Sequence, residues 1–426
     1  MKLKHVVCSA LALLGCTVQA ADKNEGAMIE RGAYLARAGD CVACHTVAGG
    51  KPFAGGLPII SPMGVIYSTN ITPDPVHGIG KYSELQFAHA LRDGLRADGK
   101  HLYPAMPYPD YKGVTDADVH ALYTYFMKGV APVRQASPQT SLSFPFSQRW
   151  GMALWNMAFT SDKPYTPVTG QSGEINQGRY LVQTLGHCGS CHTPRGAAMH
   201  EKALTDASPL YLAGGRVANW TAPSLRGMKG WSSDDIVVYL STGRNDFASV
   251  GGEMTSVVEH SMQHLSDADL RAMARYLKTL PPVPNAKSGL RVDAEAATTR
   301  TTKRLSEARG LDRGAMLYLN TCEACHASNG NGAKGIFPRL NGARIVVQDD
   351  PSALLDVILR GAQTPSTKKA PSILPMPGFA NHLNDQQVAD LATFLRSAWA
   401  NEAPPVTAKE VTAVRKELLD FQHQSR

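Results

Sequence analysis

The chain contains little cysteine outside one recurring pattern. Of its eight cysteines, six fall in three short motifs, and the other two, Cys8 and Cys16, lie within the first 20 residues. If that first segment is removed, no cysteine is left to form a disulfide or to act as a nucleophile. The cysteine content therefore argues against a disulfide-stabilised fold and against a thiol enzyme.

Long hydrophobic runs are also missing after the N-terminus. A membrane-spanning helix needs about 20 apolar residues, and no stretch beyond residue 20 approaches that length. The N-terminus itself has the form of a secretory signal, because Lys2 and Lys4 precede a short apolar run and Val18-Gln19-Ala20 offers small residues for cleavage. We therefore expect residues 1–20 to be an export signal peptide. The Leu-Leu-Gly before Cys16 resembles a lipoprotein cleavage box, so a lipid anchor there is the alternative.

The six remaining cysteines form three Cys-x-x-Cys-His motifs. These are Cys41-Val42-Ala43-Cys44-His45, Cys188-Gly189-Ser190-Cys191-His192 and Cys322-Glu323-Ala324-Cys325-His326. The motif is the attachment signature of c-type haem, in which two thiols add to the vinyl groups and the histidine ligates the iron. One copy could serve a zinc site or a thiol redox pair, but three copies favour three covalently bound haems c. The predicted attachment residues are Cys41, Cys44, Cys188, Cys191, Cys322 and Cys325, and the predicted iron ligands are His45, His192 and His326.

Each iron needs a second axial ligand or an open position for a substrate. Methionine is the usual partner where the task is electron transfer, because it raises the reduction potential. We expect it from a loop just before the last helix of each module, where the sequence offers Met106, Met254 and Met376. Met106 and Met376 are flanked by proline. Packing in a core is the alternative role, and for the second haem Met228, Met262, His260 and His264 are other candidate ligands.

An internal repeat accompanies the three motifs. A glycine and an aromatic residue precede each motif, at Gly32 and Tyr34, Gly178 and Tyr180, and Gly314 and Tyr318. Each module then closes with an amphipathic helix, for which we predict capping boxes beginning at Thr115, Ser266 and Asn384. The closing helices carry an aromatic residue at matching positions, namely Tyr125, Tyr276 and Phe394. We expect each glycine to allow the closing helix to approach closely, which pairs the two ends of a module.

The expected fold class is all-α, with three tandem class I cytochrome c domains whose long irregular loops wrap around covalently bound haems. Such loops suit a small cytochrome because the haem supplies much of the apolar core. We expect module 1 at residues 21–134, module 2 at 171–282 and module 3 at 309–400. An aromatic-rich linker (135–170), a polar linker (283–308) and a C-terminal tail (401–426) complete the chain.

Two loop patterns bear on the haem sites. Pro338-Arg339-Leu340 resembles the Pro-x-Leu of small cytochromes, whose proline carbonyl accepts the histidine ring N–H. Residues 49–58 and Ala222–Leu225 are the candidates for this role in modules 1 and 2. Gly330–Gly335 satisfies the dinucleotide pattern Gly-x-Gly-x-x-Gly, but it follows a haem motif instead of a strand, so we interpret it as loop glycine.

Net charge gives little information about partners. The formal charge is +7, but it falls when Lys2 and Lys4 leave with the signal peptide and again when the haem propionates are counted. The holoprotein is then nearly neutral, and nucleic acid is not expected as a partner. The aromatic run over residues 144–159 has three interpretations: packing between modules 1 and 2, docking of a partner subunit, or contact with a membrane surface.

The mature chain resembles the trihaem cytochrome c subunits of membrane-associated bacterial dehydrogenases that oxidise alcohols, sugars and sugar acids. The matching stretches are Gly39–Thr46, Tyr67–Asp74, Leu102–Pro109, Val257–Ser261 and Leu383–Val388. Modules 2 and 3 look most like the cytochrome subunit of flavin-dependent gluconate 2-dehydrogenase. The resemblance covers all three modules.

This resemblance implies an electron-transfer subunit with no catalytic substrate site of its own. A flavin- or quinone-dependent dehydrogenase, best matched by gluconate 2-dehydrogenase and in some complexes joined by a small third subunit, would supply the electrons. Ubiquinone or a terminal oxidase would receive them, at the periplasmic side of the inner membrane, with peripheral attachment. The alternatives are a free periplasmic electron shuttle and a haem enzyme such as a peroxidase, which would need an open iron position.

Overall fold

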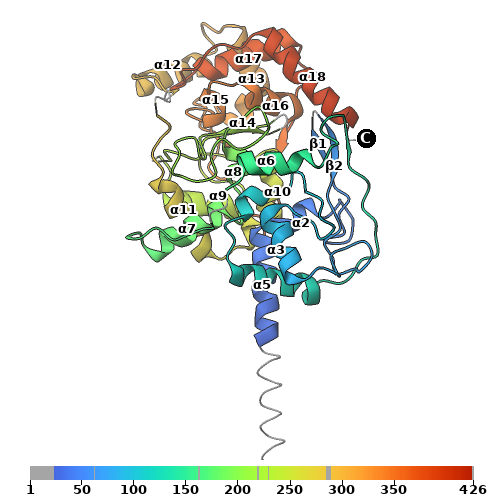
Figure 1. Cartoon of the computed structure of the whole chain (residues 1–426). Coiled ribbons are helices and arrows are strands. Elements are labelled where there is room, and N and C mark those ends of the chain that lie inside the picture. Colours follow the sequence, from blue (N-terminus) through green and yellow to red (C-terminus); the bar gives the residue numbers. More distant parts are fainter. Residues whose placement is uncertain are drawn as a thin grey trace, which may run out of the picture. The chain divides into compact units, whose positions relative to one another are not determined.

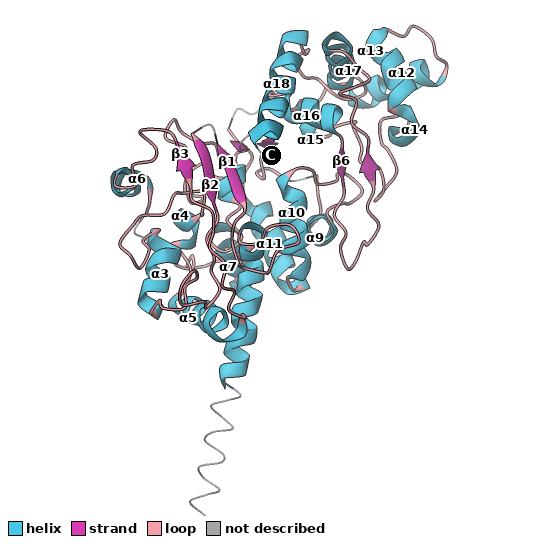
Figure 2. Cartoon of the chain, turned by 90° about the vertical axis from the view of Figure 1, so that its right-hand side faces the viewer, coloured by secondary structure: helices cyan, strands magenta, loops and turns pink. Residues whose placement is uncertain are grey.

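The computed structural model describes residues 24–61, 63–161, 164–217, 220–228, 230–284 and 289–424. The predicted signal peptide at residues 1–20, with Cys16, lies outside these ranges. The chain divides into two compact units, one formed by residues up to 59 together with 65–165, the other by 60–64 and 166–426. Helices and connecting loops dominate both units, and the strands among the described residues are two to four residues long (Figure 2).

The first unit contains module 1 and most of the aromatic-rich linker. Residues 24–38 are helical. The elements that follow are α2 (Cys41–Cys44), β1 (Pro58–Ser61), β2 (Gly64–Tyr67), α3 (Glu84–Asp93), α4 (Tyr108–Tyr111), α5 (Asp116–Thr124), the π-helical turn η1 (Tyr125–Gly129), β3 (Ser141–Leu142) and α6 (Gly151–Phe159) (Figure 1). The three strands form one small sheet in the order β1-β2-β3. The linker is therefore partly structured, since it supplies β3 and α6.

The second unit contains modules 2 and 3. Module 2 comprises α7 (Gly173–Gln183), α8 (Gly189–His192), the antiparallel pair β4 (Gly215–Val217) and β5 (Trp220–Ala222), α9 (Ser233–Thr242), α10 (Glu253–His260), η2 (Met262–His264) and α11 (Asp267–Thr279). Next come α12 (Ala294–Ser306), α13 (Arg313–Thr321), α14 (Glu323–His326), α15 (Arg344–Val347), α16 (Ser352–Arg360), the antiparallel pair β6 (Ala362–Gln363) and β7 (Pro375–Met376), α17 (Asp385–Ser397) and α18 (Ala408–Gln424).

The first and last helices of each module cross at the expected glycine. A Cβ atom on Gly32 would lie 2.1 Å from the Ala121 carbonyl oxygen and 2.5 Å from the Tyr125 Cβ. On Gly178 it would lie 1.9 Å from the Ala272 oxygen, and on Gly314 2.3 Å from the Asp390 oxygen and 2.7 Å from the Phe394 Cβ. Any side chain at these positions would separate the helices, so the predicted close pairing is confirmed.

The capping box that we predict at Asn384, in module 3, is complete. Asn384 and Gln387 bond each other's backbone N–H groups at the start of α17. Thr115 and Ser266 cap α5 and α11 through their hydroxyl groups. The aspartates three residues further on also accept bonds from the first helix, because Asp118 binds Arg31 at 3.0 Å and Asp269 binds Gln177 at 3.0 Å. The two acids thus tie the module ends together.

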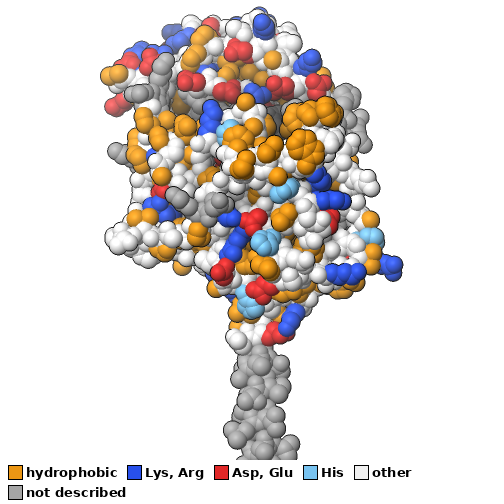
Figure 3. Space-filling view, viewed as in Figure 1, with side chains coloured by type: hydrophobic (Ala, Val, Ile, Leu, Met, Phe, Trp, Pro, Cys, Tyr) orange, Lys and Arg blue, Asp and Glu red, His pale blue; other side chains and the backbone are white. Residues whose placement is uncertain are grey.

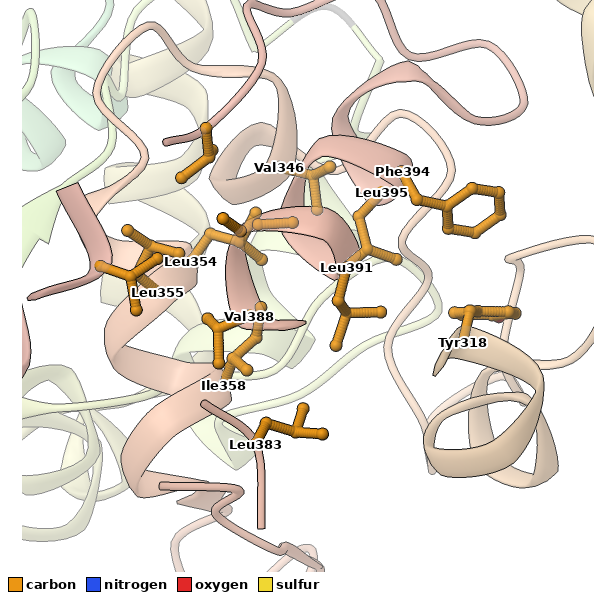
Figure 4. Close-up of a cluster of buried hydrophobic side chains, with 14 of the residues drawn as sticks. Tyr318, Val346, Leu354, Leu355, Ile358, Leu383, Val388, Leu391, Phe394 and Leu395 are labelled. Atoms are coloured by element: carbon orange, nitrogen blue, oxygen red, sulfur yellow. The ribbon is translucent and has the colours of Figure 1, made fainter. Parts of the chain in front are cut away.

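The core of module 3 extends beyond its expected boundaries (Figure 4). Tyr318, Leu354, Val388 and Leu391 are almost completely buried in it. Val411, Val414 and Leu418 from α18 belong to the same cluster, as does Leu305 from α12. The segment expected as a C-terminal tail and the segment expected as a polar linker therefore both contribute apolar side chains to this core.

Candidate haem sites

Each Cys-x-x-Cys-His motif forms a single helical turn that follows the first helix of its module. The backbone N–H groups of His45, His192 and His326 bond the carbonyl of the first cysteine of the motif at 3.0, 2.9 and 2.9 Å. Cysteines three residues apart in such a turn lie on one face. None of the six motif cysteines is in a disulfide. This geometry suits two thioether bonds to the vinyl groups of one porphyrin.

All three histidine rings are held by a backbone carbonyl. Nδ1 of His45 lies 2.6 Å from the Thr69 oxygen, Nδ1 of His192 lies 2.7 Å from the Pro223 oxygen, and Nδ1 of His326 lies 2.9 Å from the Pro338 oxygen. A carbonyl can only accept, so Nδ1 carries the ring proton and Nε2 keeps a free lone pair for iron.

The predicted carbonyl acceptors are confirmed in two modules and wrong in the other. Pro338 serves His326 and Pro223, within Ala222–Leu225, serves His192. In module 1 the acceptor is Thr69, not a residue of 49–58. The reason lies in Gly55, whose φ of +70° and missing Cβ let the Thr69 backbone pass across it, since a Cβ there would lie 2.4 Å from the Thr69 carbonyl carbon. Residues 49–58 therefore support the acceptor.

The surroundings of the three rings favour neutral imidazole. Burial lowers the pKa of His45, His192 and His326, and the bond from Nδ1 to the carbonyl opposes this only in part. The neutral ring is the form that coordinates a metal. The protein thus holds each histidine in both the tautomer and the charge state that iron requires.

Asp40 is a buried acid next to the first haem motif that sequence reasoning did not single out. It precedes Cys41 with a φ of +51° and is 7% exposed. Burial raises its pKa to about 8, although nearby Arg37 lowers it, so the carboxyl is mostly uncharged at neutral pH. The only sequence signal was its place in the Gly39–Thr46 stretch quoted for the family resemblance. The carboxyl therefore adds little negative charge beside the first motif.

The candidate distal methionines are half-buried, and each lies before the closing helix of its module. Met106 is in the loop before α4, as expected, and Met376 is in β7, paired with Ala362. Met254 lies in the first turn of α10 instead of in a loop.

Three of the four other candidate ligands of module 2 are engaged elsewhere or exposed. Met262 is only 3% exposed and packs in the core. Nε2 of His264 lies 3.1 Å from the Glu259 carbonyl oxygen, and His260 ends α10 at the surface. The fourth, Met228, is half-buried like Met254 and lies in the loop between β5 and α9, so it stays an alternative distal ligand.

The Gly330–Gly335 segment is a loop that follows α14, which agrees with its interpretation as loop glycine. Gly330, Gly332 and Gly335 have φ values of +66°, +59° and +68°. Gly330 lies against Trp399, whose Nε1 donates to the Ser328 oxygen at 3.0 Å. Trp399 therefore fixes the loop after the third haem motif to the end of α17, a role that the sequence pattern did not indicate.

Two further tests concern metals and membranes. Among the described residues, no group of three or more His, Cys, Asp and Glu side chains is arranged to hold a metal ion. Within the same ranges, no helix is both long and apolar enough to cross a bilayer.

A helical module with a haem-attachment turn and a carbonyl-held histidine is the architecture of a c-type cytochrome. The cytochrome c family model matches residues 29–129, 175–281 and 311–399. The chain belongs to the cytochrome c family, and its cofactors are three haems c, one for each matched region.

The similarity to known proteins covers nearly the whole chain. The cytochrome c subunit of the quinone-type alcohol dehydrogenase of Gluconacetobacter polyoxogenes is 46% identical, over 96% of this chain and 88% of that protein. The gluconate 2-dehydrogenase cytochrome c subunit of Pantoea cypripedii is 44% identical, over 99% and 97%. The fructose dehydrogenase cytochrome subunit of Gluconobacter japonicus is 41% identical, over 91% and 82%.

Proposed function

We propose that this chain is the electron-transfer subunit of a dehydrogenase complex. It accepts electrons from a flavin- or quinone-dependent catalytic subunit and passes them to ubiquinone or another respiratory acceptor. The observation that carries the proposal is similarity at 44–46% identity, over at least 96% of the chain, to cytochrome c subunits of alcohol and gluconate dehydrogenases. A free shuttle or a peroxidase would not need similarity to such subunits through all three modules. Gluconate remains the first substrate to test.

We further propose that the chain folds as three tandem modules, each holding one haem c through its own residues. The cysteine pairs 41/44, 188/191 and 322/325 attach the cofactor, and His45, His192 and His326 ligate the irons. Each haem supplies one-electron redox chemistry when bound. The carbonyl bonds to Nδ1 fix the ring planes and increase the basicity of Nε2. Met106, Met254 and Met376 are the proposed distal ligands, whose thioether sulfur favours the reduced state.

We also propose export by residues 1–20 to the periplasmic side of the inner membrane, where the protein attaches peripherally. A small third subunit is compatible with this arrangement, and cleavage before Cys16 with lipidation of that cysteine is the alternative to cleavage after Ala20.

The proposed function is tested by purifying the tagged full-length protein from gently solubilised membranes. We expect a flavin- or quinone-containing subunit to accompany it, and the haem α band to grow rapidly on adding one of gluconate, ethanol or glucose. Intact-mass measurement under denaturing conditions should show three haems still attached. A protein that elutes alone at its own mass and that no substrate reduces would contradict the proposal and favour a shuttle or a haem enzyme.

The face of α6 is our candidate contact with the catalytic subunit. Trp150, Leu154 and Met157 follow a helical i, i+4, i+7 spacing and are 69%, 57% and 79% exposed. Phe144 and Phe146 extend the apolar surface, and hydrophobic side chains gather over α6 in Figure 3. Exposed aromatic and methionine side chains in one patch are typical of protein interfaces.

The opposite side of α6 packs on module 1. The Tyr108 hydroxyl donates to Asn156 Oδ1 at 2.6 Å, and the Trp155 ring lies 6.4 Å from the Tyr108 ring. Arg149 is the only cation of residues 144–159, and its guanidinium lies over the Tyr103 ring at 4.5 Å. Helices that rest on lipid usually present several lysines or arginines. The charge pattern therefore favours a protein partner.

A pair of tryptophan substitutions separates docking from packing. Trp150→Ser should release the catalytic subunit during affinity purification while haem content and Tm stay unchanged, because its ring contacts solvent. Trp155→Ser, the matched control, should lower the Tm and leave the complex assembled. A Trp150→Ser complex that stays intact would refute this docking face, and joint release of both subunits from the membrane would assign the face to lipid.

A further inference from the structure

The hairpin that carries Met376 is held by module 2. Met376 pairs with Ala362 across β6 and β7, and the loop between the strands, residues 364–374, reaches toward α9 and α10 (Figure 2). Arg244 Nη1 donates to the Ser372 oxygen at 3.0 Å. Glu259 Oε1 accepts from the Ser366 N–H at 3.2 Å, and Gln263 Oε1 accepts from the Lys368 N–H at 3.1 Å. Three side chains of module 2 therefore fix the backbone of this loop.

The same contact is closely packed as well as polar. Gly243 ends α9, and a Cβ on it would lie 2.4 Å from Cγ of Pro365. Thr364 and Thr367 of the loop are 5% and 3% exposed. The loop thus fits against the end of α9 with little room to shift, so its position follows that of module 2.

Module 3 supports the Met254 segment in return. The Arg360 guanidinium, at the end of α16, lies over the Trp220 ring at 4.9 Å. Trp220 in turn packs on Gly252, where a Cβ would lie 2.2 Å from the indole. Gly252 caps α10 and precedes Met254 by two residues. The Arg360 guanidinium of module 3 therefore stabilises the position of the Trp220 ring, which packs on the start of α10, the helix that contains Met254.

A second contact supports the proximal side of module 2. Arg344 of α15 donates to the Ser224 oxygen at 2.7 Å and to the Arg226 oxygen at 3.1 Å. These residues follow Pro223, whose carbonyl holds His192. Module 3 thus supports the segments on both sides of the second haem site.

We propose that modules 2 and 3 form a mutual clamp in which each holds the segment that bears the other's distal methionine. The proposal rests on Met254 and Met376 being the ligands proposed above. Arg244 and Glu259 are then positioning residues for Met376, and Arg360 is a positioning residue for Met254. Distal ligation of the second and third haems then depends on the contact between modules 2 and 3. Met106 lies in the other unit, so ligation of the first haem does not depend on this contact.

The test uses the full-length haem-loaded protein with the double substitution Arg244→Gln, Glu259→Gln. Spectroelectrochemical titration, carbon monoxide binding to the reduced protein and the far-red band of methionine-ligated ferric haem report ligation without any dehydrogenase. Met376→Ala should shift the reduction potential of one haem, and we expect the double substitution to shift the potential of the same haem in the same direction. Carbon monoxide should then bind to as many as one of the three haems. Arg275→Gln, which removes an ion pair with Glu174 inside module 2, is the matched control and should change none of these.

Arg360→Gln tests the other part of the clamp, in which module 3 supports the Met254 segment. This variant alone is sufficient to test the clamp if the double variant cannot be produced. It should move the wave that Met254→Ala displaces and leave that of Met106→Ala in place. If Met376→Ala and Met254→Ala shift the potentials but the clamp variants match Arg275→Gln, the clamp is refuted and the ligands stand. If the methionine variants shift nothing, the ligand assignment itself fails.

Discussion

Alanine in place of Met106, Met254 or Met376 should lower the reduction potential of one haem and leave the other two near their original values. Thioether sulfur stabilises ferrous over ferric iron, and axial ligands set haem potentials over a range of roughly 0.8 V, so the displacement should be among the largest that one substitution can cause. Each variant should also open one iron to carbon monoxide. A spectroelectrochemical titration resolves the three waves, and a carbon monoxide difference spectrum counts the opened sites.

The control for the methionine series is Met262→Ala in module 2. Met262 is buried, so its loss should reduce stability through a cavity without exposing iron. Unchanged titrations in a Met254→Ala protein, together with carbon monoxide binding in Met262→Ala, would transfer the ligand role to Met262.

Gly178→Ala should severely destabilise module 2. The added Cβ would lie 1.9 Å from the Ala272 oxygen, a backbone atom that cannot move without parting α7 from α11. Overpacking of this kind costs about 3 kcal/mol or more in the free energy of unfolding. Because the haem-attachment motif begins at Cys188, shortly after the end of α7, we also expect fewer haems per chain. Denaturant unfolding and a haem-to-protein ratio measure both effects.

Gly173→Ala is the matched control, because it makes the same chemical change in the same helix. Its Cβ would meet nothing within 4 Å, so the free energy of unfolding should change by no more than about 0.5 kcal/mol. Equal stability of the two variants would show that the helix crossing tolerates a side chain, contrary to the geometry.

Features set by local chemistry could be predicted from the sequence. The Cys-x-x-Cys-His turns fix five adjacent residues, and the crossing glycines are visible because only glycine permits backbone contact at a helix crossing. The Pro338 carbonyl could be predicted because it follows its histidine by 12 residues, within one loop.

Features that depend on distant partners could not be predicted in the same way. The acceptor of His45 is Thr69, because the β1–β2 hairpin intervenes and Gly55 lets the later segment cross. Asp118 accepts a bond from Arg31, 87 residues earlier in the sequence, and the capping pattern alone does not indicate this partner. The contact of Arg244 with Ser372 joins residues 128 apart, and no periodic pattern connects them.

The carbonyl acceptors also determine how the haem sites respond to mutation. Every amino acid supplies a backbone oxygen, so most substitutions at Thr69, an exposed residue, leave the His45 acceptor in place. The haem site is instead sensitive to substitution of Gly55, because a side chain there would displace the Thr69 backbone. A saturation library should therefore show that Thr69, the acceptor, tolerates most substitutions whereas Gly55 does not, so that the glycine is the residue under stronger purifying selection.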